Sequence, residues 1–234
     1  MPKITYTKEE RKELDQMANE FVTALNLGVL KDTCIFSVFF QNAIKFSIKT
    51  HEVYQKQKRK GKDIPYIVHP LTVGLILSKA GAPDHVIVGG ILHDTIEDSI
   101  EDKKVTYEMI QERFGSSVAD IVNDVTEQNK SLPWRERKQI ALEHIEIMEK
   151  PSLWVKTADV ICNISDLLVD YKKDGEKVFD RFNASKEDSL LNNHSVLKAL
   201  IKRWEDGDNP LLSDLKVLLI ELERIMKDMK IKLD

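Results

Sequence analysis

Residues 84–98 read DHVIVGGILHDTIED, an apolar run that passes directly into a histidine and three carboxylates. If this stretch is helical, His93 lies over Glu97 and Asp94 over Asp98, because residues four apart share one face of a helix. An imidazole and several carboxylates beside a buried segment are costly unless a cation neutralises them. The mixture suits Zn²⁺, Fe²⁺ or Mn²⁺, and the excess of carboxylates favours Mn²⁺. The stretch therefore predicts a helical protein with a divalent metal site.

The remainder of the chain repeats the helical spacing. Asp84 is the expected N-cap of the apolar helix, and Pro70 is expected in the first turn of the helix before it. Apolar residues recur at steps of three and four near residues 14–25, 39–50, 71–77, 106–114, 118–125, 141–148, 155–162 and 215–229. Turn-forming residues gather in 61–65, 170–175 and 205–210. Alternating β-type segments are hard to find. We therefore expect a single all-α domain, a helical bundle that spans residues 1–234.

The composition is that of an ordinary soluble protein, with 42% hydrophobic and 32% charged residues. The net charge of −4 is small, so it indicates neither a nucleic-acid partner nor a membrane partner. No secretory signal and no stretch long enough to cross a bilayer is evident. The two cysteines, Cys34 and Cys162, form no disulfide framework and fit a reducing compartment. We expect a cytoplasmic protein, and its oligomeric state stays open.

A metal site needs more ligands than His93 and Asp94. His69, just before Pro70, is a candidate third ligand, and Asp159 within a later apolar segment is a candidate fourth. Taken singly, a histidine before a proline is more often a capping or solvated residue, and an aspartate in a helix is more often a surface charge. Spacing alone leaves both interpretations open.

The order of these residues decides between the interpretations. The chain reads His69-Pro70, then His93-Asp94, then Asp159, which resembles the His…His-Asp…Asp pattern of the HD superfamily of metal-dependent phosphohydrolases. Within it, the chain is most similar to the hydrolase domain of the RelA/SpoT alarmone enzymes and to their small stand-alone relatives. The matching text is Arg59-Lys60-Gly61, Pro65-Tyr66-Ile67-Val68-His69-Pro70, Leu92-His93-Asp94-Thr95-Ile96-Glu97-Asp98, Phe114-Gly115, Val125-Thr126, and Lys156-Thr157-Ala158-Asp159 with Asn163. The resemblance covers residues 40–170, with helical extensions at both ends.

The resemblance implies a role for each matching residue. The implied metal ligands are His69, His93, Asp94 and Asp159. Glu97 and Asp98 correspond to the catalytic acidic pair that positions or deprotonates the attacking water. Arg59 matches the residue that packs against the guanine base, and Asn163 matches a position that contacts the ribose or a phosphate.

Other residues are interpreted from their surroundings. Within the basic run 56–62, Arg59 and Lys60 are expected to draw a polyphosphate toward the ion, whereas the other lysines are expected to be solvated. His51 is expected on a helix surface, and Cys162 as a core residue rather than a nucleophile. Trp134 is expected to anchor the core at the start of a helix. Arg137 and Lys138 (a neighbouring basic pair) are left without a role.

The resemblance implies a Mn²⁺-dependent enzyme that hydrolyses a small nucleotide. The leading candidate is (p)ppGpp, which would yield GDP or GTP plus pyrophosphate from the 3′ position. No alarmone synthetase domain is expected within this chain. One alternative is a broader HD-type nucleotide phosphohydrolase or 5′-nucleotidase, which the metal ligands do not distinguish from the first. Another is an inactive, metal-stabilised binding protein, which the presence of both Glu97 and Asp98 disfavours.

Overall fold

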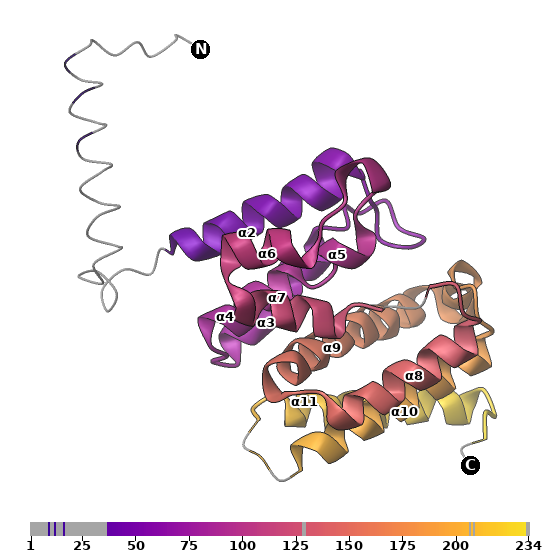
Figure 1. Cartoon of the computed structure of the whole chain (residues 1–234). Coiled ribbons are helices and arrows are strands. Elements are labelled where there is room, and N and C mark those ends of the chain that lie inside the picture. Colours follow the sequence, from indigo (N-terminus) through magenta and orange to yellow (C-terminus); the bar gives the residue numbers. More distant parts are fainter. Residues whose placement is uncertain are drawn as a thin grey trace. The chain divides into compact units, whose positions relative to one another are not determined.

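A computed structural model describes residues 37–127, 130–205, 207 and 209–232, together with Glu9, Lys12 and Gln16. Apart from an isolated bridge between Lys58 and Pro65, the regular elements of these residues are all helices, so the predicted all-α class is confirmed (Figure 1). The elements are α2 (Val38–Ile48), the π-helix η1 (Lys49–Tyr54), α3 (Val68–Lys79), α4 (Asp84–Leu92), α5 (Thr95–Asp98), the 3₁₀-helix η2 (Glu101–Lys103), α6 (Tyr107–Phe114), α7 (Ser116–Val125), α8 (Trp134–Ile147), α9 (Lys150–Asp174), the 3₁₀-helix η3 (Gly175–Arg181), α10 (Lys186–Trp204) and α11 (Leu212–Asp228).

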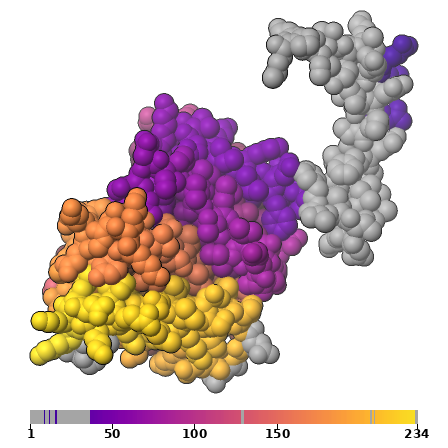
Figure 2. Space-filling model, turned by 180° about the vertical axis from the view of Figure 1, so that it is seen from behind, coloured from indigo at the N-terminus to yellow at the C-terminus, as the bar shows by residue number. Residues whose placement is uncertain are grey.

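Residues 39–234 form one compact unit with α9 at its centre. This helix packs against α3, α4 and α7 on one side and against α10, α11 and η3 on the other (Figure 1). Its buried residues recur around most of its circumference, as expected for a helix covered on several sides. Seen from behind, the C-terminal helices form the lower half of the surface and the segment after residue 38 forms the upper half (Figure 2). The central position of α9 is what brings Asp159 into the interior.

Helices α3 and α4 approach closely because glycines lie where they touch. A Cβ atom at Gly90 would come within 2.4 Å of the Leu77 side chain, and one at Gly74 within 2.6 Å of the Ile91 side chain. Every residue of α4 from Val86 to Leu92 is buried. The close contact places the start of α3 beside the end of α4, and each of these ends carries a histidine.

Most predicted helix boundaries are confirmed. Pro70 lies in the first turn of α3, α6 begins after a Thr106 cap and ends at Phe114, and α7 begins at Ser116. The loop between α10 and α11 also falls where turn residues predicted it.

Three local predictions were wrong. Asp84 is the first residue of α4 and not its cap, because the extended Pro83 precedes it. The helix also does not continue through 93–98. The His93 ring and the Thr95 hydroxyl donate to the carbonyls of Gly90 and Leu92, and side-chain bonds of this kind compete with helix continuation. Segment 170–174 is not a loop, because α9 continues to Asp174.

Two features of the sequence were misread. A helix over 186–204 was not predicted, although Ser185 caps it by accepting a hydrogen bond from the Asp188 amide at 3.0 Å. His51 was expected on a surface but has no exposed side-chain area, because the π-helix η1 turns it inward with Thr50.

Other predictions lie outside the described residues or stay untested. Apart from Gln16, the helix predicted near 14–25 falls outside them, and so does Cys34. That residues 1–234 form a single domain remains a prediction. Among the helices of the described segments, none is long and apolar enough to span a bilayer.

Candidate metal centre and active site

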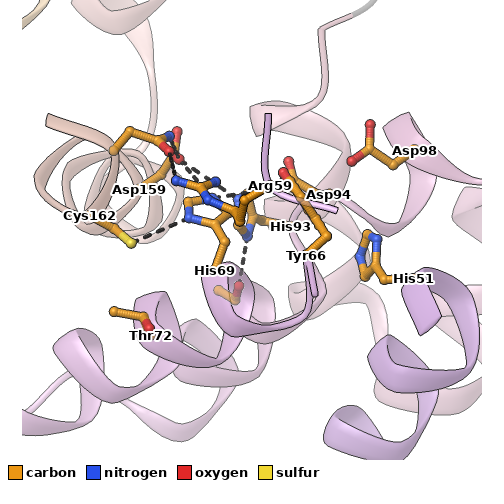
Figure 3. Close-up of polar contacts among 12 residues, drawn as sticks. His51, Arg59, Tyr66, His69, Thr72, His93, Asp94, Asp98, Asp159 and Cys162 are labelled. Carbon is orange, nitrogen blue, oxygen red and sulfur yellow. Dashed lines mark hydrogen bonds and ion pairs between the residues drawn. The ribbon is translucent and has the colours of Figure 1, made fainter. Parts of the chain in front are cut away.

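Two imidazoles and a carboxylate from three separate segments meet in the interior (Figure 3). His69 lies in the first turn of α3, His93 in the turn after α4, and Asp159 within α9. One donor atom from each lies within 4.8 Å of the others. The two histidine residues are almost completely buried, at 2% and 4% exposure. Side chains far apart in the sequence thus form a compact set of nitrogen and oxygen donors.

Hydrogen bonds on the far side of each ring orient the histidines. His93 Nδ1 lies 2.7 Å from the Gly90 carbonyl oxygen, so this nitrogen carries the hydrogen and donates it. Its Nε2 is buried, and no hydrogen bond to it is formed by the described residues. His69 Nδ1 lies 3.3 Å from the Cys162 sulfur, and its Nε2 lies 3.2 Å from Asp159 Oδ1. Both rings thereby turn Nε2 inward, which is the arrangement that metal-binding histidines adopt.

Asp94 lies beside the same two rings. Its Oδ2 is 3.0 Å from His93 Nε2 and 3.7 Å from His69 Nε2, and it accepts a hydrogen bond of 2.5 Å from the Tyr66 hydroxyl. The 3.0 Å approach is an ion-pair distance without hydrogen-bond geometry, since His93 Nε2 has no hydrogen-bond partner among the described residues. Burial opposes ionisation of Asp94, but His93 and then His69 outweigh it and hold the pKa of Asp94 below its usual range. All four side chains that the sequence singled out as metal ligands therefore lie together.

Asp159 is held by two neighbours on its own helix. Lys156 Nζ lies 3.0 Å from Asp159 Oδ2, and the Asn163 amide donates to Oδ1 at 2.6 Å. Burial opposes ionisation of Asp159 too, but Lys156 and then His69 hold its pKa well below its usual range. Lys156 was given no role from the sequence, although its spacing of three residues from Asp159 is that of a helical ion pair.

The electrostatics of this group favour an added cation. Burial lowers the pKa of His93, but Asp94 and Asp159 outweigh burial and raise it to about 9. The two carboxylates therefore favour a positive charge at the His93 ring, which a proton or a metal ion can supply. Imidazole and carboxylate donors together suit a divalent ion of the Mn, Fe or Zn type. The orphaned Nε2 of His93 and this donor set fit such an ion.

Glu97 and Asp98 lie on the one-turn helix α5 next to this group. Glu97 lines a cleft of about 570 Å³ that opens over the two histidines, and its Oε2 accepts the backbone N–H of Glu127 at 3.1 Å. Asp98 lies on the same side of Tyr66 as His51 (Figure 3), and its Oδ2 accepts the Gln57 amide at 2.8 Å. Burial, and then the nearby Asp94, raise the pKa of Asp98, and burial chiefly raises the pKa of Glu97. Raised pKa values suit carboxyl groups that exchange protons near neutral pH.

Arg59 and Asn163 are joined to the metal group by hydrogen bonds. The Arg59 guanidinium donates to Asn163 Oδ1 at 3.0 Å and to Asp166 Oδ2 at 2.9 Å. It also lies 5.8 Å from the centre of the Tyr66 ring. Asn163 in turn donates to Asp159, so the three residues form one connected network.

A second chamber of about 410 Å³ adjoins the cleft, and the two share Lys156, Asp159, Asn163, Arg137, Lys138 and Ala141. Lys60 lines this chamber, where its Nζ lies 3.3 Å from Asn183 Oδ1 and 5.9 Å from the centre of the Phe182 ring. Trp134 begins α8 but is partly exposed and lines the same chamber, so its interpretation as a core anchor was wrong.

Glu127 holds two basic side chains that line the cleft, Arg137 and Lys138. It accepts hydrogen bonds from Arg137 and from Lys138, the latter at 2.7 Å. Burial opposes ionisation of Glu127, but Lys138 and Arg137 outweigh it and lower its pKa. The sequence contained the glutamate and both cations within twelve residues, but their pairing depends on the turn before α8.

Cys162 is buried, as predicted. Burial raises the pKa of its thiol to about 12, so the thiolate that a nucleophile requires is scarce at neutral pH. Its sulfur serves instead as a neighbour of His69.

Comparisons with known proteins give consistent similarities. A family model described as HD domain matches residues 43–188. A guanosine-3′,5′-bis(diphosphate) 3′-pyrophosphohydrolase of Xenopus tropicalis is 37% identical over 127 residues, which are 53% of this chain and 67% of that protein. Its Danio rerio namesake is 35% identical over 136 residues, 57% of this chain and 72% of that protein. A solved structure described as a metazoan ortholog of SpoT that hydrolyses ppGpp matches the fold with a TM-score of 0.62 at 22% identity, over 86% of this chain and 100% of that chain.

Proposed function

This chain belongs to the HD domain family, and we propose that it is a metal-dependent hydrolase that removes pyrophosphate from the 3′ position of (p)ppGpp. The observation that carries the proposal is the buried donor group of His69, His93 and Asp159, with both Nε2 atoms turned inward, beside the carboxyl group of Glu97 in one cleft. Relatives at 35–37% identity that bear the name of this activity support the choice of substrate.

We propose His69, His93, Asp94 and Asp159 as the residues that hold the ion. Mn²⁺ is the proposed metal because two carboxylates and two imidazoles form a mixed donor set that includes hard oxygen ligands. When bound, a divalent ion supplies Lewis-acid polarisation of a phosphoryl oxygen and acidifies water. The chain contributes the oriented imidazoles and keeps Asp94 and Asp159 ionised for this purpose.

Glu97 and Asp98 are the proposed proton acceptors for the attacking water. Glu97 is fixed by the Glu127 backbone N–H and lies 3.5 Å from the Lys130 ammonium, and it faces the cleft. A carboxylate held in place beside the reacting phosphorus can orient a water and accept its proton. The raised pKa of each group increases its strength as a base when it is ionised.

The cleft and the chamber beside it carry charges that suit a polyphosphorylated nucleotide. Arg137, Lys138 and Lys156 line both, and Lys60 lines the chamber. Clustered cations near a cleft concentrate anionic ligands even in a chain whose net charge is negative. We propose that Arg59, Lys60 and Asn163 contact the substrate, which is a small nucleotide. We also propose that the protein acts in the cytoplasm.

The experiment that tests this function is product analysis with purified protein and Mn²⁺. Release of pyrophosphate together with GDP from ppGpp, or GTP from pppGpp, is the expected result. Release of inorganic phosphate from nucleoside monophosphates, with no reaction on ppGpp, would favour the broader phosphohydrolase and reject the proposal.

Two glutamate variants give the matched comparison. Glu97→Gln should lower kcat by about 10²- to 10⁴-fold, the usual contribution of a general base, while metal content stays equal to that of wild type. Glu112→Gln, at an exposed glutamate on α6, should behave like wild type. Loss of metal from Glu97→Gln would show that Glu97 is a ligand rather than a base.

A further inference from the structure

A partly buried chain of two hydrogen bonds leads from His51 through Gln57 to Asp98. His51 Nδ1 lies 2.9 Å from Gln57 Oε1, and Gln57 Nε2 lies 2.8 Å from Asp98 Oδ2. His51 has no exposed side-chain area, and its ring centre is 5.1 Å from that of Tyr66. His51 and Asp98 lie on the same side of Asp94 and Tyr66, away from Asp159 (Figure 3). None of these contacts has a role in the metal group itself.

The chemistry of the carboxylate fixes the direction of each bond. An ionised Asp98 can only accept, so the Gln57 amide must present its N–H₂ group to Asp98 and its carbonyl oxygen to His51. A carbonyl oxygen also only accepts, so His51 Nδ1 must carry a hydrogen. The remaining nitrogen, Nε2, is buried and receives no hydrogen bond from the described residues. The chain is therefore polarised from His51 through Gln57 to Asp98.

The backbone holds Gln57 rigidly between its two partners. Its N–H donates to the His51 carbonyl at 2.9 Å, and its own carbonyl accepts the Tyr66 N–H at 2.9 Å. The π-helix η1, which places His51 inside the protein, packs against α5. Single π-helical turns are frequent at functional sites. The main chain thus aims the Gln57 amide independently of the Asp98 side chain.

Asp98 needs such support because its own helix gives little. Helix α5 contains only Thr95–Asp98, and Asp98 is its last residue before extended backbone. Gln57 occupies Oδ2, and Oδ1 has no hydrogen bond to the described protein. One oxygen is therefore anchored while the other stays available.

We propose that Gln57 is a positioning residue for Asp98 in the hydrolytic reaction, and that His51 holds the Gln57 amide in the orientation that donates to the carboxylate. The inference rests on the proposed function of Asp98 as one of the proton-accepting pair. Removal of the anchor lets the Asp98 carboxylate rotate away from the attacking water. Substrate binding and metal binding, which use other side chains, stay as they are.

The test replaces Gln57 with methionine, which has similar length but no N–H donor. Gln57→Met should lower kcat by about 10- to 100-fold, the usual effect of removing a group that orients a reactive side chain. KM for ppGpp and the bound metal should stay within about twofold of wild type. Gln55→Met is the matched control, because Gln55 lies two residues earlier and its side chain makes no polar contact with the described residues. It should behave like wild type.

A double-mutant cycle separates positioning from general damage to the fold. In an Asp98→Asn background, the further change Gln57→Met should lower kcat by less than about twofold. The reason is that the effects of two residues that act through one another do not add. A full additional loss of about 10-fold or more, or equal losses of activity and of metal, would overturn the proposal.

The imidazole tautomer of His51 gives a readout that does not depend on turnover. Long-range ¹H–¹⁵N correlation spectra of the wild-type protein, with His51 assigned by comparison with His51→Asn, should show a hydrogen on Nδ1. A hydrogen on Nε2 alone would overturn the proposal, even if Gln57→Met failed to fold. If wild type does not act on ppGpp, the proposed function fails by itself. The spectra then still decide whether the hydrogen bonds run from His51 through Gln57 to Asp98.

Discussion

Removal of the divalent ion should lower the thermal stability of the protein by a predictable amount. A ligand that binds only the folded state stabilises it by RT ln(1 + [L]/Kd), which is about 2.7 kcal/mol at a hundred times Kd. For a unit of 150–250 residues, each kcal/mol shifts Tm by roughly 2–4 °C. Mn²⁺ at that excess should therefore raise Tm by about 5–11 °C over the chelated protein.

The structure indicates why the gain in thermal stability should come from an ion at the buried donor group. Without an ion, Asp94 and Asp159 share the interior with His93, whose Nε2 has no hydrogen bond to the described protein. Non-specific binding to surface carboxylates also occurs in a chain with a net charge of −4, but it is weak and screened by salt. Stabilisation by an ion in the buried site should exceed stabilisation by surface binding, because salt screens a buried ion much less.

The assay is thermal unfolding followed by circular dichroism, with Mn²⁺ or with chelator, at constant ionic strength. Asp159→Asn should abolish the metal-dependent shift, since an amide is a weaker ligand than a carboxylate. Asp63→Asn is the matched control, because the Asp63 side chain is 89% exposed, and its shift should equal that of wild type. Equal shifts in all three proteins would refute the assignment of Asp159 to the metal group. No shift in wild type would refute the metal site as a whole.

Three further predictions concern the active site and the packing that supports it. Burial raises the pKa of Glu97, and a general base must be ionised to accept a proton. As the pH is lowered, kcat/KM should therefore fall at a pH above the ordinary glutamate pKa of about 4.3. A pH–rate profile in which kcat/KM falls only at about 4.3 or below would contradict this. Trp204→Phe removes the buried indole N–H that donates to Thr157 Oγ1 at 2.9 Å. The free energy of unfolding, measured with urea, should fall by about 1–3 kcal/mol. A loss below about 0.5 kcal/mol would show that the bond contributes little. Gly90→Ala adds about 1 kcal/mol of helix propensity but brings a Cβ atom to within 2.4 Å of the Leu77 side chain. The overpacking, which costs about 1–3 kcal/mol, should outweigh this gain and lower Tm. An unchanged or higher Tm would show that the Leu77 side chain moves aside without cost.

The sequence determined the helices and the candidate ligands for separate physical reasons. Most helix positions follow from the spacing of apolar residues and from local caps such as Thr106, so they were predictable from short stretches of sequence, although the helix over 186–204 was missed. The pairing of His69 with His93 and Asp159 was predictable only from the order of motifs, because no local rule states which helix ends will meet. Where side chains bond to backbone carbonyls, as in the turn at His93, even the local prediction failed.

What only the tertiary structure decided is the set of partners that these residues acquire. By itself, the sequence determined the all-α class, most helix boundaries and four candidate ligands, because these depend on short-range spacing and on a recognisable order of residues. Packing alone decided that His51 lies inside the protein beside Gln57, that Tyr66 donates to Asp94, and that α8 and α10 line a second chamber. Such contacts join residues that can lie far apart in the chain, and their energies depend on burial and distance, which no sequence pattern encodes.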